Sequence, residues 1–263
     1  MKENNFLFNS YYSWWKNIDK VLLLLILSLF FLGLFFSFVS TSLIASDKLS
    51  TNSYYFFIKH LLFVILGVSI LLIFSLFEKD KLLNLSLILF ILFFICLILV
   101  PIIGVEVKGS KRWIDIGVFF PRFQPIELLK PFFIILLASS LSFNKNKNIY
   151  LNYFFSALVL IPIILLLVSQ PDIGQTMLII MTWLSLVFIS GVNLIIFFSF
   201  FLFIGLTLSF MIFFVKKFVY IKNRLLSFID PGAGNNYQSE KASEAIINGG
   251  FFGKGIGEGS LNS

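Results

Sequence analysis

Seven long apolar runs constrain the fold of this 263-residue chain more than any other feature of its sequence. A helix needs about 20 mostly apolar residues to cross the hydrocarbon core of a bilayer, and each run has roughly that length. We therefore predict seven membrane spans: Val21–Ala45, Ile58–Phe77, Leu82–Val100, Ile126–Phe143, Leu151–Val168, Ile173–Ser190 and Leu194–Val215.

The composition agrees with a membrane protein. Hydrophobic residues make up 59% of the chain and charged residues 13%, whereas soluble domains carry about 25% charged residues. We predict an all-α, polytopic integral membrane helical bundle with about seven transmembrane helices. It comprises an N-terminal segment (1–20), a transmembrane domain (21–215) and a C-terminal segment (216–263). The first run is too long for a removable signal peptide, and no small-residue cleavage site follows it.

Charge and single reactive residues narrow the classes of partner. The net charge is +7, but the basic residues lie in short loops between spans, which favours anionic lipid head groups or a phosphorylated lipid over nucleic acid. Cys96 is the only cysteine, so an intrachain disulfide is excluded. His60 has no second histidine or cysteine cluster with which to bind a metal.

Counting spans predicts which polar segments share a membrane face. Residues 108–124 are separated from residues 170–172 by two crossings, and these from the tail from 216 by two more, so all three should emerge on one side. Of the 20 Lys and Arg residues, seven lie on the opposite, N-terminal side, which leaves 13 on this face or at its boundaries. Taken alone, the positive-inside rule would place this face in the cytoplasm.

Charge is concentrated between Lys108 and Lys130, beside apolar runs where it is costly. Pro125 and Glu127 suit a helix start, because proline is favoured at the first helical position and an acid interacts well with the positive end of the helix dipole. Lys130 lies three residues beyond Glu127, within pairing distance on a helix. Two explanations stay open: a structural ion pair, or a functional polar cleft that includes Gln124.

The adjoining Lys111-Arg112-Trp113 also has two interpretations. Tryptophan and basic residues anchor proteins at the head-group layer. Arginine also offers planar, bidentate donors that suit phosphate, so these residues could instead bind a diphosphate, with Trp113 covering a sugar or lipid face.

Gln170-Pro171-Asp172 places an acid at the start of the sixth predicted span, where helix capping and a site role are both open. The C-terminal segment contains Asp230, Tyr237, Gln238 and a glycine-rich stretch ending at Glu258. Its glycines permit tight turns and close ligand approach, but the spacing is neither that of a Walker loop nor that of a dinucleotide-binding loop.

Taken together, these segments resemble the SEDS family of cell-wall proteins, and its division members more than its elongation members. The resemblance covers nearly the whole chain. The matching residues are Trp15–Asp19, Gly109–Ile114, Gln124–Pro125 with Glu127 and Lys130, Gln170–Thr176, Arg224 with Phe228–Pro231, Tyr237–Gln238 and Gly249–Gly259.

The resemblance implies about ten spans, a cytoplasmic N-terminus and the polar motifs outside, with residue 216 beginning a large extracytoplasmic loop. This topology overrides the positive-inside count if the outer basic residues handle an anionic lipid. The family's presumed catalytic aspartate follows the glycine-rich segment. We therefore expect this chain to be a C-terminally truncated fragment whose catalytic aspartate lies beyond Ser263, and we assign no catalytic residue within it.

The implied activity is that of a peptidoglycan glycosyltransferase that polymerises lipid II during septal cell-wall synthesis. Lys111, Arg112 and Lys130 would neutralise the departing diphosphate, with or without Mg²⁺ or Mn²⁺, and Glu127 would orient Lys130. The weaker candidates for substrate contact are Trp113, Gln124, Gln170, Asp172, Asp230, Tyr237, Gln238 and Glu258.

The resemblance also implies a partner and a location. These are a class B penicillin-binding protein with other division proteins, and the septum of a bacterial inner membrane. Two alternative functions remain: a transporter that flips lipid II, which would also need a polar cavity, and a division scaffold without catalysis of its own.

Overall fold

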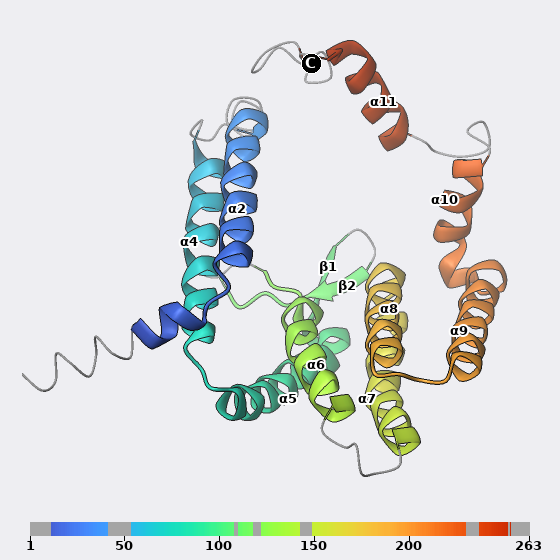
Figure 1. Cartoon of the computed structure of the whole chain (residues 1–263). Helices are drawn as coiled ribbons and strands as arrows, with labels where there is room; N and C mark the ends of the chain where they lie inside the picture. The colour runs from blue at the N-terminus through green and yellow to red at the C-terminus, as the bar shows by residue number, and fades with distance from the viewer. Residues whose placement is uncertain are drawn as a thin grey trace, which may run out of the picture. The chain divides into compact units, whose positions relative to one another are not determined.

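A computed structural model describes residues 12–41, 54–107, 110–117, 122–142, 149–229, 237–251 and 253. The chain divides into two compact units, one of residues 1–77 and 235–263 and the other of residues 78–234. Figure 1 shows their elements in chain order.

The first unit contains two apolar helices, α2 (Lys20–Thr41) and α4 (Tyr55–Ser75), which pack against each other. Asp19 caps the N-terminus of α2. Its Oδ1 accepts hydrogen bonds from the backbone N–H groups of Val21 and Leu22, each at 3.0 Å. Such a cap satisfies donors that the first helical turn leaves unpaired. Helix α11 (Tyr237–Gly249) is polar and belongs to the same unit.

The second unit holds the other apolar helices and a small hairpin. In chain order it contains α5 (Lys79–Ile103), β1 (Val105–Val107), β2 (Ser110–Trp113), α6 (Pro125–Ser142), α7 (Ile149–Ser169), α8 (Ile173–Ile189), α9 (Leu194–Phe214), a short 3-10 turn (Lys216–Phe218) and α10 (Val219–Ile229).

The predicted spans are found as helices. Six helices of the described residues are long and apolar enough to cross a membrane, and the remaining predicted span, Ile173–Ser190, is found as α8, an apolar helix of 17 residues. The molecule is therefore a helical membrane bundle. The hairpin was not predicted, because strands of three and four residues carry too little periodicity to be recognised.

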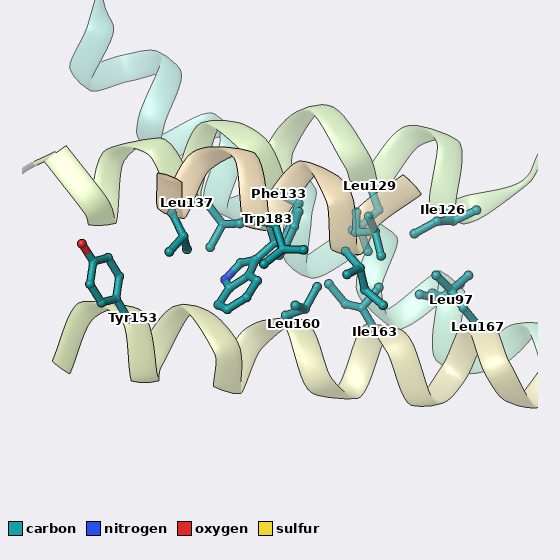
Figure 2. Packing of buried hydrophobic residues seen from close by; sticks show 14 of the residues in the cluster. Leu97, Ile126, Leu129, Phe133, Leu137, Tyr153, Leu160, Ile163, Leu167 and Trp183 are labelled. Carbon is teal, nitrogen blue, oxygen red and sulfur yellow. The ribbon is translucent and has the colours of Figure 1, made fainter. Parts of the chain in front are cut away.

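The core of the second unit lies where α6, α7 and α8 meet, and α5 contributes Leu97. Figure 2 shows Phe133, Ile163 and Trp183 pointing into this interior. Trp183 satisfies its indole N–H by donating to the Ser156 hydroxyl at 3.0 Å. A buried polar group needs such a partner, since leaving it unpaired costs free energy.

Candidate functional site

The hairpin separates side chains that are neighbours in sequence. Strands β1 and β2 are antiparallel, and along β2 the exposure alternates, with Ser110 and Arg112 half-buried and Lys111 and Trp113 exposed. This follows from the two-residue period of a strand. Lys111, Arg112 and Trp113 therefore do not form one cluster: Arg112 faces the helices, and the other two side chains face away.

Arg112 spans the turn between α7 and α8. Its Nη2 donates to the carbonyl oxygen of Pro171 at 2.5 Å, and its Nε donates to that of Gln170 at 3.4 Å. Both carbonyls follow the C-terminal end of α7, where a positive charge interacts favourably with the helix dipole. The guanidinium thus fastens the hairpin to this turn.

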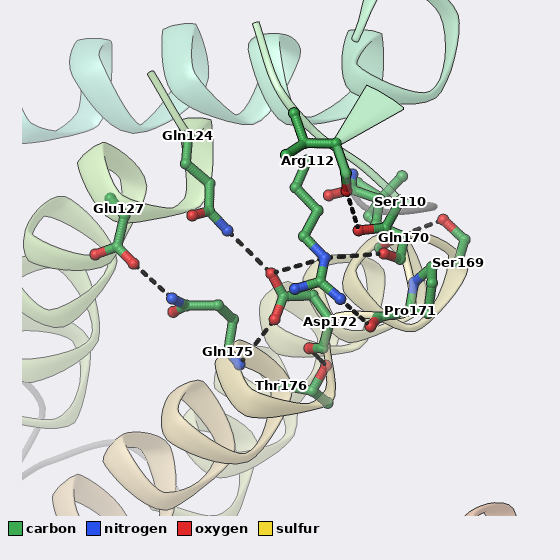
Figure 3. Close-up of polar contacts among 12 residues, drawn as sticks. Ser110, Arg112, Gln124, Glu127, Ser169, Gln170, Pro171, Asp172, Gln175 and Thr176 are labelled. Atoms are coloured by element: carbon green, nitrogen blue, oxygen red, sulfur yellow. Dashed lines mark hydrogen bonds and ion pairs between the residues drawn. The ribbon is translucent and has the colours of Figure 1, made fainter. Parts of the chain in front are cut away.

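Asp172 joins the hairpin, α6 and α8 (Figure 3). Its Oδ2 accepts from Gln124 Nε2 at 2.9 Å and lies 3.6 Å from Arg112 Nε. Its Oδ1 accepts from the backbone N–H of Gln175 at 3.4 Å, which makes Asp172 the N-cap of α8. The Asp172 side chain is only 7% exposed and that of Arg112 28% exposed, so the pair is partly shielded from water.

Gln170 is buried beneath this cluster and contacts α5. Its Nε2 donates to the carbonyl oxygen of Leu97 at 3.4 Å. Pro101 stands four residues after Leu97 inside α5, and proline has no N–H with which to make the usual helical bond to that carbonyl. The Gln170 amide therefore supplies a donor that the helix itself lacks.

A second polar cluster lies one turn into α6 and α8. Lys130 Nζ is 2.7 Å from Glu127 Oε2, and it donates to Gln175 Oε1 at 2.9 Å. Gln175 Nε2 in turn donates to Glu127 Oε1 at 2.5 Å. The Lys130 side chain is 15% exposed, whereas that of Glu127 is 49% exposed. The predicted pairing of Glu127 with Lys130 is confirmed.

A third contact joins the two ends of the segment between the hairpin and α6. Arg122 Nε donates to Asp115 Oδ2 at 2.9 Å, and the backbone N–H of Gly117 donates to Asp115 Oδ1 at 3.0 Å. The arginine and then the backbone bond hold the pKa of the Asp115 carboxyl below its usual value. Ile114 and Phe123 pair through their backbones beside this contact.

Arg112 and Gln124 both contact residues 170–172, which agrees with the prediction that these two segments lie on one face. That the tail from residue 216 shares this face stays a prediction. Four candidates are not placed at this site by the structure. Asp230 and Glu258 lie outside the described residues, as does Lys108. Tyr237 and Gln238 begin α11, which belongs to the other unit.

Within the described residues, no group of three His, Cys, Asp or Glu side chains is arranged to hold a metal ion. Mg²⁺ is usually bound by one or two carboxylates together with substrate phosphates. Binding of such a cation at this site would therefore require phosphate oxygens from a bound substrate.

Sequence reasoning missed Gln175 as a site residue. Its position three residues after Asp172 places it one turn into α8, and α6 presents Glu127 and Lys130 one turn from its own start. The packing of α6 against α8 brings these residues together. The sequence alone does not show that these two helices are neighbours, so the hydrogen bonds of Gln175 to Glu127 and Lys130 could not be predicted.

The two clusters together give a fixed, partly buried arrangement of cations, amides and carboxylates at one end of the helix bundle. A profile of the cell cycle protein family that groups FtsW, RodA and SpoVE matches residues 19–262. The chain belongs to this family. The resemblance to the SEDS proteins is thereby confirmed.

Individual relatives support the assignment to the family. The chain is 34% identical over 252 residues to the probable peptidoglycan glycosyltransferase FtsW of Coxiella burnetii, with 93% of this chain and 66% of the relative covered. It is 33% identical over 264 residues to the protein of that name from Buchnera aphidicola of Acyrthosiphon pisum, with 95% and 62% covered. The chain thus spans less than two thirds of the length of these FtsW proteins.

Comparison with a solved structure confirms the fold. This structure is described as "Structural coordination of polymerization and crosslinking by a peptidoglycan synthase complex". It superposes with a TM-score of 0.68 over 89% of this chain and 67% of that chain, at 24% sequence identity. Similarity at this level of identity establishes the shared helical membrane architecture.

Proposed function

We propose that this chain is part of a peptidoglycan glycosyltransferase that polymerises lipid II, and that its polar clusters bind the diphosphate end of that lipid. The observation that carries the proposal is the position of Lys130, whose ammonium is fixed by two acceptors at the end of a membrane helix bundle. An intramembrane cation held in this way is a functional-site candidate by default. The names of the FtsW relatives support the choice of reaction.

In the proposed reaction a sugar hydroxyl attacks the anomeric carbon of the growing strand. The bond from that carbon to the diphosphate oxygen breaks, and undecaprenyl diphosphate leaves with the electron pair. Negative charge builds up on the departing oxygen, so cations preorganised beside it lower the barrier most. Lys130 is our candidate for this role. We assign the general base to none of the described residues.

The contacts of the hairpin support different roles for Arg112 and for its neighbours Lys111 and Trp113. Arg112 donates to two backbone carbonyls and lies beside Asp172, which favours a positioning role over direct phosphate binding. Lys111 and Trp113 are exposed on the other side of β2. There they are available to a head group or a sugar, since tryptophan and lysine favour the membrane interface.

The proposed setting is a bacterial inner membrane, at the division septum, with the N-terminus in the cytoplasm and both clusters on the outer side. The proposed partner is a class B penicillin-binding protein. That the related structure is from work on a peptidoglycan synthase complex supports this partnership.

The test is polymerisation of labelled lipid II in liposomes by the full-length protein with its partner. Lys130→Ala should reduce glycan formation about 100-fold, the scale seen when one charge-stabilising donor is removed. Lys81→Ala is the matched control, because Lys81 also pairs with a glutamate three residues away, Glu78, but at an exposed position. Lipid movement between leaflets without any polymer would overturn the proposal in favour of a transporter.

A further inference from the structure

Gln175 closes a three-membered ring of polar contacts with Glu127 and Lys130. Each of the three side chains touches the other two: carboxylate with ammonium at 2.7 Å, ammonium with amide oxygen at 2.9 Å, and amide nitrogen with carboxylate at 2.5 Å. Figure 3 shows the Gln175 side chain directed at Glu127 across the gap between α8 and α6. The ring therefore links two helices, whereas the Glu127–Lys130 pair alone lies on one.

The amide of Gln175 is suited to complete this ring. The oxygen of glutamine accepts a hydrogen bond while its nitrogen donates another, so it can serve an ammonium and a carboxylate at the same time. A glutamate at this position would place a second carboxylate against Glu127. A leucine of similar size would make neither bond.

The backbone of Gln175 is also tied to the other cluster. Its N–H donates to Asp172 Oδ1 at 3.4 Å, and Asp172 is held by Gln124 and Arg112. Gln175 is thus the residue through which the Asp172 cluster fixes the position of the Lys130 ammonium relative to the start of α8.

We propose that Gln175 is a positioning residue that orients the Lys130 ammonium toward a phosphate oxygen of a lipid diphosphate. A lysine ammonium has three N–H donors. Glu127 and Gln175 accept two of them, and the ring directs the third toward the ligand. This inference rests on the proposed function, since it names the residue that prepares Lys130 for that ligand.

The decisive experiment exchanges the two partners of Lys130 in the full-length protein in lipid nanodiscs. Undecaprenyl diphosphate is the probe, and its dissociation constant is measured by native mass spectrometry. Gln175→Leu should weaken binding about tenfold, the loss expected when a hydrogen bond to a charged group is removed. Gln175→Glu should weaken binding at least as much, because two carboxylates then compete with the diphosphate for Lys130.

The double variant Gln175→Glu with Glu127→Gln restores one carboxylate, one amide and one ammonium, with the first two exchanged. It should bind the probe within about threefold of the wild type, because the net charge and the donor-acceptor pattern return. Glu78→Gln, which removes the exposed partner of Lys81, is the control for unspecific loss of a carboxylate and should leave binding unchanged.

Two results would overturn the inference: Gln175→Leu binding the probe like the wild type, or the exchanged pair binding no better than Gln175→Glu. Failure of the proposed function looks different, because then the wild-type protein forms no polymer from lipid II whatever residue 175 is. Polymerisation by the wild type with unchanged probe binding in Gln175→Leu rejects only the role of Gln175.

Discussion

Gln170 donates from its side chain to the carbonyl oxygen of Leu97, the acceptor that Pro101 leaves without its usual helical donor. The contact joins α5 to the turn before α8, 73 residues away in sequence. Gln170 also connects α5 to the hairpin, because its backbone carbonyl oxygen accepts a hydrogen bond from Arg112 of β2.

Replacing Gln170 by leucine should therefore destabilise the bundle by about 1 kcal/mol, since a buried carbonyl loses its partner. Unfolding in mixed micelles measures the change. In a Pro101→Ala background, residue 101 regains an N–H that can donate to Leu97, so the cost of Gln170→Leu should fall there. An equal cost in both backgrounds would show that the bond to Leu97 is not what Gln170 contributes.

Asp172 should matter for stability both as a cap and as the partner of Arg112. Asp172→Ala should cost about 2 kcal/mol, because the cap alone contributes about 1 kcal/mol and Arg112 loses a partly buried partner. Asp172→Asn keeps the capping oxygen and should cost less. The control is Asn193→Ala, which removes the exposed cap of α9. Equal losses in Asp172→Ala and Asn193→Ala would contradict a contribution from Arg112.

The contact between Asp115 and Arg122 predicts a pH dependence. The folded-state pKa of Asp115 lies below its ordinary value of 3.8, so this contact stabilises the fold above that value. The stabilisation is lost as the pH falls through the lower, folded-state pKa. Arg122→Ala should raise the pKa of Asp115 toward 3.8, which the carboxyl ¹³C shift in an NMR titration reports. A pKa that stays low in Arg122→Ala would assign the effect to the Gly117 backbone instead.

The spans could be predicted from sequence because each is set by a local property, the length of an apolar run. Ile126–Phe143 was predicted where α6 covers Pro125–Ser142, and Leu194–Val215 where α9 covers Leu194–Phe214. The pairing of Glu127 with Lys130 was equally local. Gln175 was missed because its partners come from another helix, and the sequence does not state which helices pack together.

The side on which Arg112 lies could not be predicted for the same reason. As a neighbour of Lys111 and Trp113 it looks like part of one basic cluster, and only the hairpin's two-residue period separates them. Four residues are too few for this period to be recognised from the sequence. The inward direction of Arg112 is decided by its partners on the turn before α8.

The buried hydrogen bond from Trp183 to Ser156 gives a last prediction, which concerns the core. Ser156→Ala should destabilise the bundle by about 1 to 2 kcal/mol, because the indole N–H is then buried without a partner. Trp183→Phe removes that N–H but also leaves a cavity.

If the hydrogen bond is the main interaction between the two side chains, Ser156→Ala should cost much less in the Trp183→Phe background. Unfolding titrations of the two single variants and the double variant form the cycle that measures this coupling. Ser185→Ala is the matched control, because Ser185 is exposed on the same helix and its hydroxyl donates to the carbonyl oxygen of Met181, one helical turn away. Additive losses in the double variant would show that Trp183 stabilises the core by packing alone.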